Sequence, residues 1–179
     1  EWVLWSQKVL IKKGFILELL QYDIDKSVSL TMILNLQNKI NSISQESSDI
    51  NEHILNMSEY AKDCSHITEM GVRGITSTWA WLYGLSDHDR EVSGLIKLYN
   101  WFNSQFFRKT LISYDIQNPS KFKASIQDVY ETANSYNINF KFHEKNVLDV
   151  KIDKTDLLFL DTWHSYKQLK AELSLHAKK

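Results

Sequence analysis

The chain has 179 residues, of which 43% are hydrophobic and 12% aromatic, so its length matches about one domain with a substantial core. Its five glycines and one proline compare with about 20 in a chain of average usage. This scarcity excludes a collagen-like chain, a flexible linker or a Pro-rich disordered tail, and it argues against an all-β protein. The net charge of −1 offers no overall field for nucleic acid, so no such partner is expected.

The first 47 residues are predicted to form a mostly helical extension. Apolar residues at 33, 36, 40 and 43 repeat at helical spacing, which predicts a helix over 28–43. Residues 1–27 stay ambiguous because Gly14 interrupts their apolar face. The polar run 42–48 is the expected linker. No apolar stretch reaches about 18 residues, so neither a membrane span nor a membrane partner is expected.

From residue 48 onward, predicted strands and helices alternate. Strands are expected over 65–70, 111–115, 138–142 and 156–161, and helices over 49–62, 76–82, 92–107, 121–135 and from 166 to the end. The fourth strand is apolar throughout its middle, which is typical of a strand buried on both faces. The alternation predicts an α/β fold with a parallel sheet, in which ligands bind at the carboxyl ends of the strands.

Two helix starts carry predicted caps. Asp49 and Glu52 have the spacing of a capping box, and Thr76 or Ser77 is expected to cap the next helix. Between these helices lies the single cysteine, Cys64, which excludes a disulfide framework and a cysteine-based zinc site. It fits a reducing compartment, so we expect a cytoplasmic protein.

The first two strands end in residues that suit a ligand site. Strand one runs into Glu69-Met70-Gly71-Val72-Arg73-Gly74, where glycines would let the backbone approach a ligand closely. The second strand ends in Asp115, an acid that can hydrogen-bond the hydroxyls of a ribose. A tight turn at the glycines and a capping role for Asp115 are the structural alternatives, and both stay open.

The fourth strand ends in Asp161-Thr162-Trp163-His164-Ser165-Tyr166. A histidine can exchange a proton near neutral pH, and an adjacent acid can orient it or hold a cation. The alternative is a helix N-cap with an incidental histidine. The remaining five histidines have no comparable neighbours and are interpreted as structural or surface residues.

Together, these segments resemble class I S-adenosylmethionine-dependent methyltransferases, in the branch of small sugar and antibiotic O-methyltransferases and cephalosporin-hydroxylase-like proteins. The resemblance covers about residues 48–179, and its most specific part is Asp-Leu-Leu-Phe-Leu-Asp-Thr-Trp-His-Ser-Tyr at 156–166. It implies a three-layer Rossmann-like domain over 48–179, with a parallel sheet in the order 3-2-1-4 between helices. It also implies S-adenosyl-L-methionine as cofactor and a small-molecule acceptor.

The resemblance also implies residue roles. Asp161 would lie near the transferred methyl group and is the candidate Mg²⁺ ligand, and His164 would be the base that deprotonates the acceptor hydroxyl. The remaining implied roles are in cofactor binding: Glu69 near the amino-acid part, Gly71 and Gly74 beside the methionine moiety, Asp115 on the ribose, and Asn146 and Val147 at the adenine.

The chain differs from the family pattern in three places. Gly71 and Gly74 are three apart where the branch has a spacing of four, which puts Ile75 where a glycine is usual. An extra helical segment is expected at about 86–108. The family sheet has seven strands, whereas this chain ends after the helix that follows the fourth, so the C-terminal strands are expected to be missing.

Three functions are weighed on these grounds. The first is a methyltransferase acting on a hydroxyl of a sugar or small metabolite. The second is a non-catalytic methyltransferase-like fragment, a binding or assembly module whose open sheet edge is covered in a homo-oligomer. The third is a dinucleotide enzyme, which the missing Gly-x-Gly-x-x-Gly disfavours. Trp79, Trp81 and Trp163 are candidates for an aromatic lining, with core packing as the alternative.

Overall fold

The computed structural model describes residues 35–86 and 108–177. The chain divides into two compact units, Glu1–Lys39 and Ile40–Lys179, and the second carries the features discussed below. A helix covers residues 35–45, within the predicted helical extension. The expectations for residues 1–34 and for a helix over 92–107 lie outside the described residues, and the predicted domain boundary after residue 47 stays a prediction.

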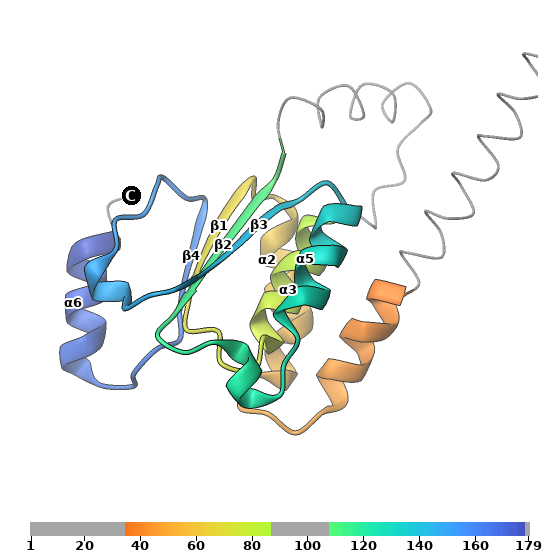
Figure 1. Cartoon of the computed structure of the whole chain (residues 1–179), viewed down its shortest axis with the longest axis horizontal. Coiled ribbons are helices and arrows are strands. Elements are labelled where there is room, and N and C mark those ends of the chain that lie inside the picture. The colour runs from red at the N-terminus through yellow and green to blue at the C-terminus, as the bar shows by residue number, and fades with distance from the viewer. Residues whose placement is uncertain (1–34, 87–107, 178–179) are drawn as a thin grey trace, which may run out of the picture. The chain divides into compact units, whose positions relative to one another are not determined.

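Four parallel strands form one sheet in the order β3-β2-β1-β4 (Figure 1), as expected. The strands are β1 (His66–Met70), β2 (Thr110–Asp115), β3 (Asn139–Glu144) and β4 (Leu157–Leu160). Chain order and sheet order reverse between β1 and β4, so this is the topological switch point of a Rossmann-like α/β fold. In the described part of the chain, no helix combines the length and the apolar character that crossing a membrane requires.

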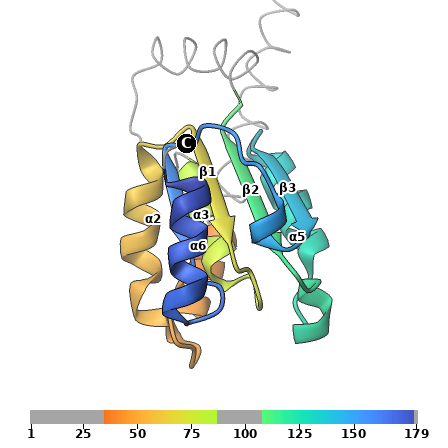
Figure 2. The ribbon, with the colours of Figure 1, turned by 90° about the vertical axis from the view of Figure 1, so that its left-hand side faces the viewer.

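Helices cover both faces of the sheet. Three lie on one face, α2 (Ile54–Lys62), α3 (Thr76–Leu85) and α5 (Ile126–Ser135), and α6 (Tyr166–His176) lies on the other, as Figures 1 and 2 show. Short 3₁₀ turns complete the order: η1 (Asn51–His53), η2 (Pro119–Phe122) and η3 (Val147–Asp149). The predicted helix over 121–135 begins later than expected, because the chain reverses at Lys123 with φ +60° before Ser125 caps α5.

The core on the α6 face lies directly below the carboxyl ends of the strands. It is built from Met70, Tyr114, Val147 and Ile152, all buried. Met70 and Tyr114 are paired in the register of β1 and β2, while Val147 comes from η3. The turn after β3 is therefore held to the sheet by burial of its apolar side chain, and it stays beside the strand ends.

The expected burial of the fourth strand on both faces is wrong. All four residues of β4 are only half-buried. The physical reason is position: β4 is an edge strand with β1 on one side, and within the described residues it has no strand on the other. On the α3 side, the ring of Phe159 meets Trp81 edge-on at 5.1 Å.

Neither predicted cap forms. Ile50 occupies the N-cap of η1 without a side-chain bond, and α2 starts only at Ile54. The N-cap of α3 is Ile75, again without a side-chain bond. The polar groups are used elsewhere: Asp49 pairs with an arginine of the glycine turn, and the hydroxyl of Ser77 bonds to a buried acid. Tertiary partners have replaced local capping in both places.

Gly84 permits α2 and α3 to cross closely. A Cβ at this position would lie 2.2 Å from the carbonyl oxygen of Ser58 and 2.5 Å from Cβ of Ala61. We expect Gly84→Ala to lower the free energy of unfolding by about 1–3 kcal/mol, because the helices must separate. Urea unfolding measures this, with Gly74→Ala, which fills open space, as control. Equal midpoints for the two variants would contradict the close crossing.

Candidate functional site

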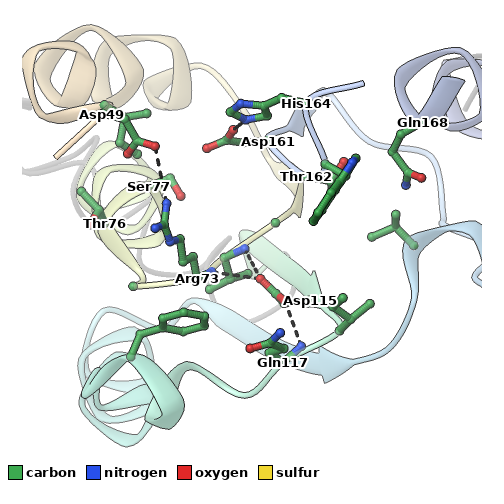
Figure 3. Close-up of a pocket in the computed structure, with 18 of the residues that line it drawn as sticks. Asp49, Arg73, Thr76, Ser77, Asp115, Gln117, Asp161, Thr162, His164 and Gln168 are labelled. Atoms are coloured by element: carbon green, nitrogen blue, oxygen red, sulfur yellow. Dashed lines mark hydrogen bonds and ion pairs between the residues drawn. The ribbon is translucent and has the colours of Figure 1, made fainter. Parts of the chain in front are cut away.

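A pocket of about 860 Å³ opens at the carboxyl ends of the strands. Its wall is formed by the turns that follow all four strands, with a contribution from the loop before η1 (Figure 3). This volume is in the range of small-molecule sites. The pocket spans the switch point between β1 and β4, which is where open α/β sheets bind their ligands. Of the eight predicted site residues, seven line it: Gly71, Gly74, Asp115, Asn146, Val147, Asp161 and His164.

Gly71 lies at the closest approach between the β1 turn and the end of β4. Its φ is +89°, and a Cβ there would lie 1.9 Å from the carbonyl oxygen of Asp161. Its own N–H donates to the carbonyl of Tyr114 at 2.9 Å. The glycine therefore makes room for protein backbone, and it brings the β1 turn and the β4 end into direct contact at the pocket.

The left-handed backbone conformation typical of glycine occurs at Ile75 and not at Gly74. Gly74 is exposed, and a Cβ there would meet only Thr76 Oγ1, at 3.9 Å. Ile75 has φ +61° and ψ 16°, a left-handed conformation that is costly for a β-branched residue. The backbone thus demands glycine-like geometry at Ile75, as its position in the motif suggests, while Gly74 leaves bare backbone facing the pocket.

Asp115 fastens two turns at once. Its Oδ2 accepts the N–H groups of Val72 at 2.8 Å and Arg73 at 2.9 Å, and its Oδ1 accepts from Gln117 N at 2.9 Å. The capping explanation is therefore real, and it extends to the glycine turn 42–43 residues earlier in the chain. A carboxylate can accept about four bonds, so one position stays available to a ligand hydroxyl.

Glu69 does not line the pocket. It is completely buried and lies behind the glycine turn. Its carboxylate accepts hydroxyl bonds from Ser77 at 2.5 Å, Thr78 at 2.8 Å and Ser113 at 2.6 Å. Burial raises the pKa of Glu69, while the three hydroxyl bonds oppose that shift. The acid thereby joins β1, β2 and the start of α3, and it acts on the pocket by holding the turn.

The turn after β3, which we call the β3 lip (residues 146–149), presents Asn146 and Val147. The side chain of Asn146 accepts from Leu148 N at 3.1 Å and caps η3. Val147 is 4% exposed and belongs both to the pocket wall and to the apolar core. The lip is therefore a preformed surface, apolar at one residue and polar at the next.

The turn after β4, the β4 lip (residues 161–164), carries the titratable pair. Nε2 of His164 lies 2.9 Å from Oδ1 of Asp161 (Figure 3). The histidine side chain is 76% exposed and the aspartate 30%. Since an ionised carboxylate only accepts, Nε2–H donates in this contact, and in the neutral ring the lone pair is then on Nδ1. The bond orients the histidine ring, which solutes can reach.

Of the three tryptophans considered for an aromatic lining, only Trp163 belongs to the pocket wall. It is 78% exposed. Trp79 and Trp81 are 6% and 2% exposed, so the core-packing interpretation is confirmed for them. Both lie on α3, where the Trp81 ring packs against Phe159 of β4, and a large apolar ring gains by such burial.

Several pocket residues were not predicted. Arg73 Nη1 lies 3.7 Å from Oδ2 of Asp49, and this ion pair crosses one end of the pocket (Figure 3). Other unpredicted lining residues are Ile50, Ile116, Gln117, Phe122, Thr162 and Gln168. The usable signal was a position after a predicted strand: Arg73 and Thr162 stand in the segments that end the first and fourth strands, and Ile116 and Gln117 directly follow Asp115. Ile50, Phe122 and Gln168 reach the pocket from segments without that signal.

Too few ligating side chains surround Asp161 to form a cation site. Among residues 35–86 and 108–177, no group of three or more His, Cys, Asp or Glu side chains converges as a metal site. Asp161 and His164 are a pair bonded to each other, so we derive no chemical step through a metal ion.

In comparisons with protein-family models and with curated proteins, no family model and no curated sequence matches the chain.

Proposed function

We propose that the pocket binds S-adenosyl-L-methionine and that the chain is a methyltransferase acting on a hydroxyl of a sugar or small metabolite. The observation that carries this proposal is the convergence of two groups of residues on one pocket. The glycine turn with Asp115 comes from β1 and β2, and the Asp161–His164 pair follows β4. The resemblance of the sequence to class I methyltransferases supplies the identity of the ligand.

The residues fit that cofactor at its polar and apolar ends. Asp115 retains an acceptor position for a ribose hydroxyl. Ile116 is 62% exposed beside it and, with Val147, offers apolar surface for an adenine ring. At the other end, Gly74 leaves space beside the backbone for the amino-acid part. The resemblance implies the roles of Asp115, Val147 and Gly74, and the places of these residues on the pocket wall support them.

The proposed reaction requires that the acceptor hydroxyl be positioned beside the methyl group and that one proton be removed from it. When bound, S-adenosylmethionine supplies an electrophilic sulfonium methyl group. Asp161 holds the His164 ring through Nε2–H, so Nδ1 can accept the proton of the acceptor hydroxyl. The exposed ring of Trp163, which directly precedes His164, offers an apolar surface to the face of an acceptor.

Calorimetric titration with S-adenosylmethionine and S-adenosylhomocysteine tests the proposal. We expect micromolar binding of both, and Gly74→Val to weaken it by about tenfold or more, since it places a branched side chain in the open space at Gly74. Gly84→Ala, which lies outside the pocket lining, is the control for destabilisation alone. Absence of heat with both ligands, or binding of NAD in their place, would overturn the proposal.

A non-catalytic binding or assembly module is the second candidate. It is favoured by the β4 edge, where four apolar residues are half-buried and, among the described residues, no further strand pairs. A chain that binds neither S-adenosylmethionine nor its product would have this function in preference to catalysis.

A further inference from the structure

Two buried polar side chains of α6 point to opposite sides of the pocket. Glu172 is 1% exposed and His176 is 2% exposed. They are four residues apart, so they share one face of the helix. Buried polar groups of this kind are costly unless they are bonded, and each of these two has a bond to one of the pocket lips.

Glu172 is bonded to the β4 lip. Its Oε1 accepts from Thr162 Oγ1 at 2.5 Å and from Gln168 Nε2 at 2.7 Å. Thr162 belongs to the β4 lip, whereas Gln168 is a residue of α6 itself, so the Thr162 bond is the one that ties α6 to the lip. Both donors line the pocket (Figure 3). Thr162 is adjacent to Asp161, so the buried acid holds the backbone that carries the Asp161–His164 pair.

His176 is bonded to the β3 lip. Its Nε2 lies 2.9 Å from the carbonyl oxygen of Val147. A carbonyl oxygen only accepts, so Nε2–H is the donor. Val147 lines the pocket, and α6 packs on η3 along this contact. The same helix face therefore reaches the lip on which we place the adenine.

The two lips belong to opposite edges of the sheet. β3 and β4 do not pair with each other, because β2 and β1 lie between them. The link through α6 therefore joins strand ends that the sheet does not join directly. We propose that α6 is a clamp, and that Glu172 and His176 are positioning residues that together set the separation of the β3 and β4 lips.

The clamp has a defined consequence for the site. Loss of the Glu172–Thr162 bond removes the tie between α6 and the β4 lip, and α6 can then shift relative to the sheet. Such a shift stretches the His176–Val147 bond, so a change at one lip is felt at the other. That the clamp aligns cofactor and base rests on the proposed function, whereas the coupling of the lips does not.

Amide hydrogen exchange of the full chain without ligand tests the coupling. We expect Glu172→Leu to accelerate exchange by about tenfold at two β3-lip amides, Leu148 N and Asp149 N, which bond to Asn146. The amide of Thr110, which bonds to Ser65 O at the opposite end of the sheet, should not change. Glu172→Gln keeps an oxygen for both donors and should stay within about twofold of the wild type.

The opposite substitution gives the second half of the test. His176→Leu should accelerate exchange at Ser165 N, which directly follows the β4 lip and bonds to Trp163 O of that lip. If either variant accelerates exchange at all amides alike, the test is repeated with Thr162→Val, which removes the hydroxyl that bonds to Glu172, and with Thr162→Ser, which keeps it. Acceleration confined to the lip that has lost its bond to α6 overturns the clamp. Coupled exchange in a chain that binds no S-adenosylhomocysteine would support the clamp and overturn the proposed function.

Discussion

Gly71→Ala is expected to lower the free energy of unfolding by at least about 3 kcal/mol. Two costs add at this position. The backbone has φ +89°, which L-residues rarely adopt, and the new Cβ would lie 1.9 Å from the carbonyl oxygen and 2.5 Å from the carbonyl carbon of Asp161. These are backbone atoms, so no side-chain rotation relieves the clash. Chemical unfolding followed by circular dichroism measures the loss.

Gly74→Ala is the matched control for this prediction. It adds the same methyl group three residues later in the same turn, where its nearest neighbour would be Thr76 Oγ1 at 3.9 Å. Its effect on stability should stay within about 0.5 kcal/mol. Equal losses for the two variants would mean that the β1 turn and the β4 end do not touch as described.

The Gly71 substitution also separates structure from chemistry at the pocket. To make room for the Cβ that Gly71→Ala adds, the β4 lip must move away from β1, and it carries Asp161 and His164 with it. Any turnover should therefore fall together with stability. Gly74→Ala, in contrast, leaves the lip in place and can only act through space in the pocket.

The architecture was predictable because it depends on local patterns. Apolar runs bounded by polar turns predicted all four strands, and their alternation with helices predicted a parallel sheet. The strand ends then gathered the candidate residues, since the carboxyl ends of parallel strands meet at one edge. The order of the strands followed from the family resemblance and agrees with the structure.

The failures share a different cause, which is partners distant in sequence. Asp49 has a cap-like spacing to Glu52, yet its structural partner is Arg73. Ser77 precedes a helix, yet its hydroxyl bonds to Glu69. Spacing along the chain contains no information on these contacts. Burial of β4 failed similarly, because an apolar strand sequence does not say how many neighbours the strand has.

For Asp115 the structural interpretation is confirmed, and it is compatible with the proposed binding of a ligand. A cap and a ligand-binding acid looked like alternatives, but the carboxylate has enough acceptor positions for both. By holding Val72 and Arg73, it sets the shape of the glycine turn that a ligand would meet. A structural bond here is part of what would make the site.

Glu69→Ala is expected to cost about 3–5 kcal/mol of unfolding free energy, because it leaves three buried hydroxyl groups without their acceptor. Those groups belong to Ser77, Thr78 and Ser113, all 3% exposed or less. Denaturant unfolding measures the loss. Ser120→Ala, at an exposed site on η2, should change stability by less than about 0.5 kcal/mol.

The pH dependence of Glu69→Gln distinguishes the buried charge from the hydrogen bonds. Burial raises the folded-state pKa of Glu69, so the folded protein binds this proton more tightly than the unfolded chain, whose pKa is about 4.3. The stabilisation due to this shift is fully present below that unfolded pKa and is lost as the pH rises through the folded pKa. Glutamine does not titrate, so the destabilisation by Glu69→Gln should be larger at low pH than at high pH. A difference between wild type and variant that stays constant across this range would show that the carboxyl titrates alike in both states, and that the hydroxyl bonds fully offset its burial.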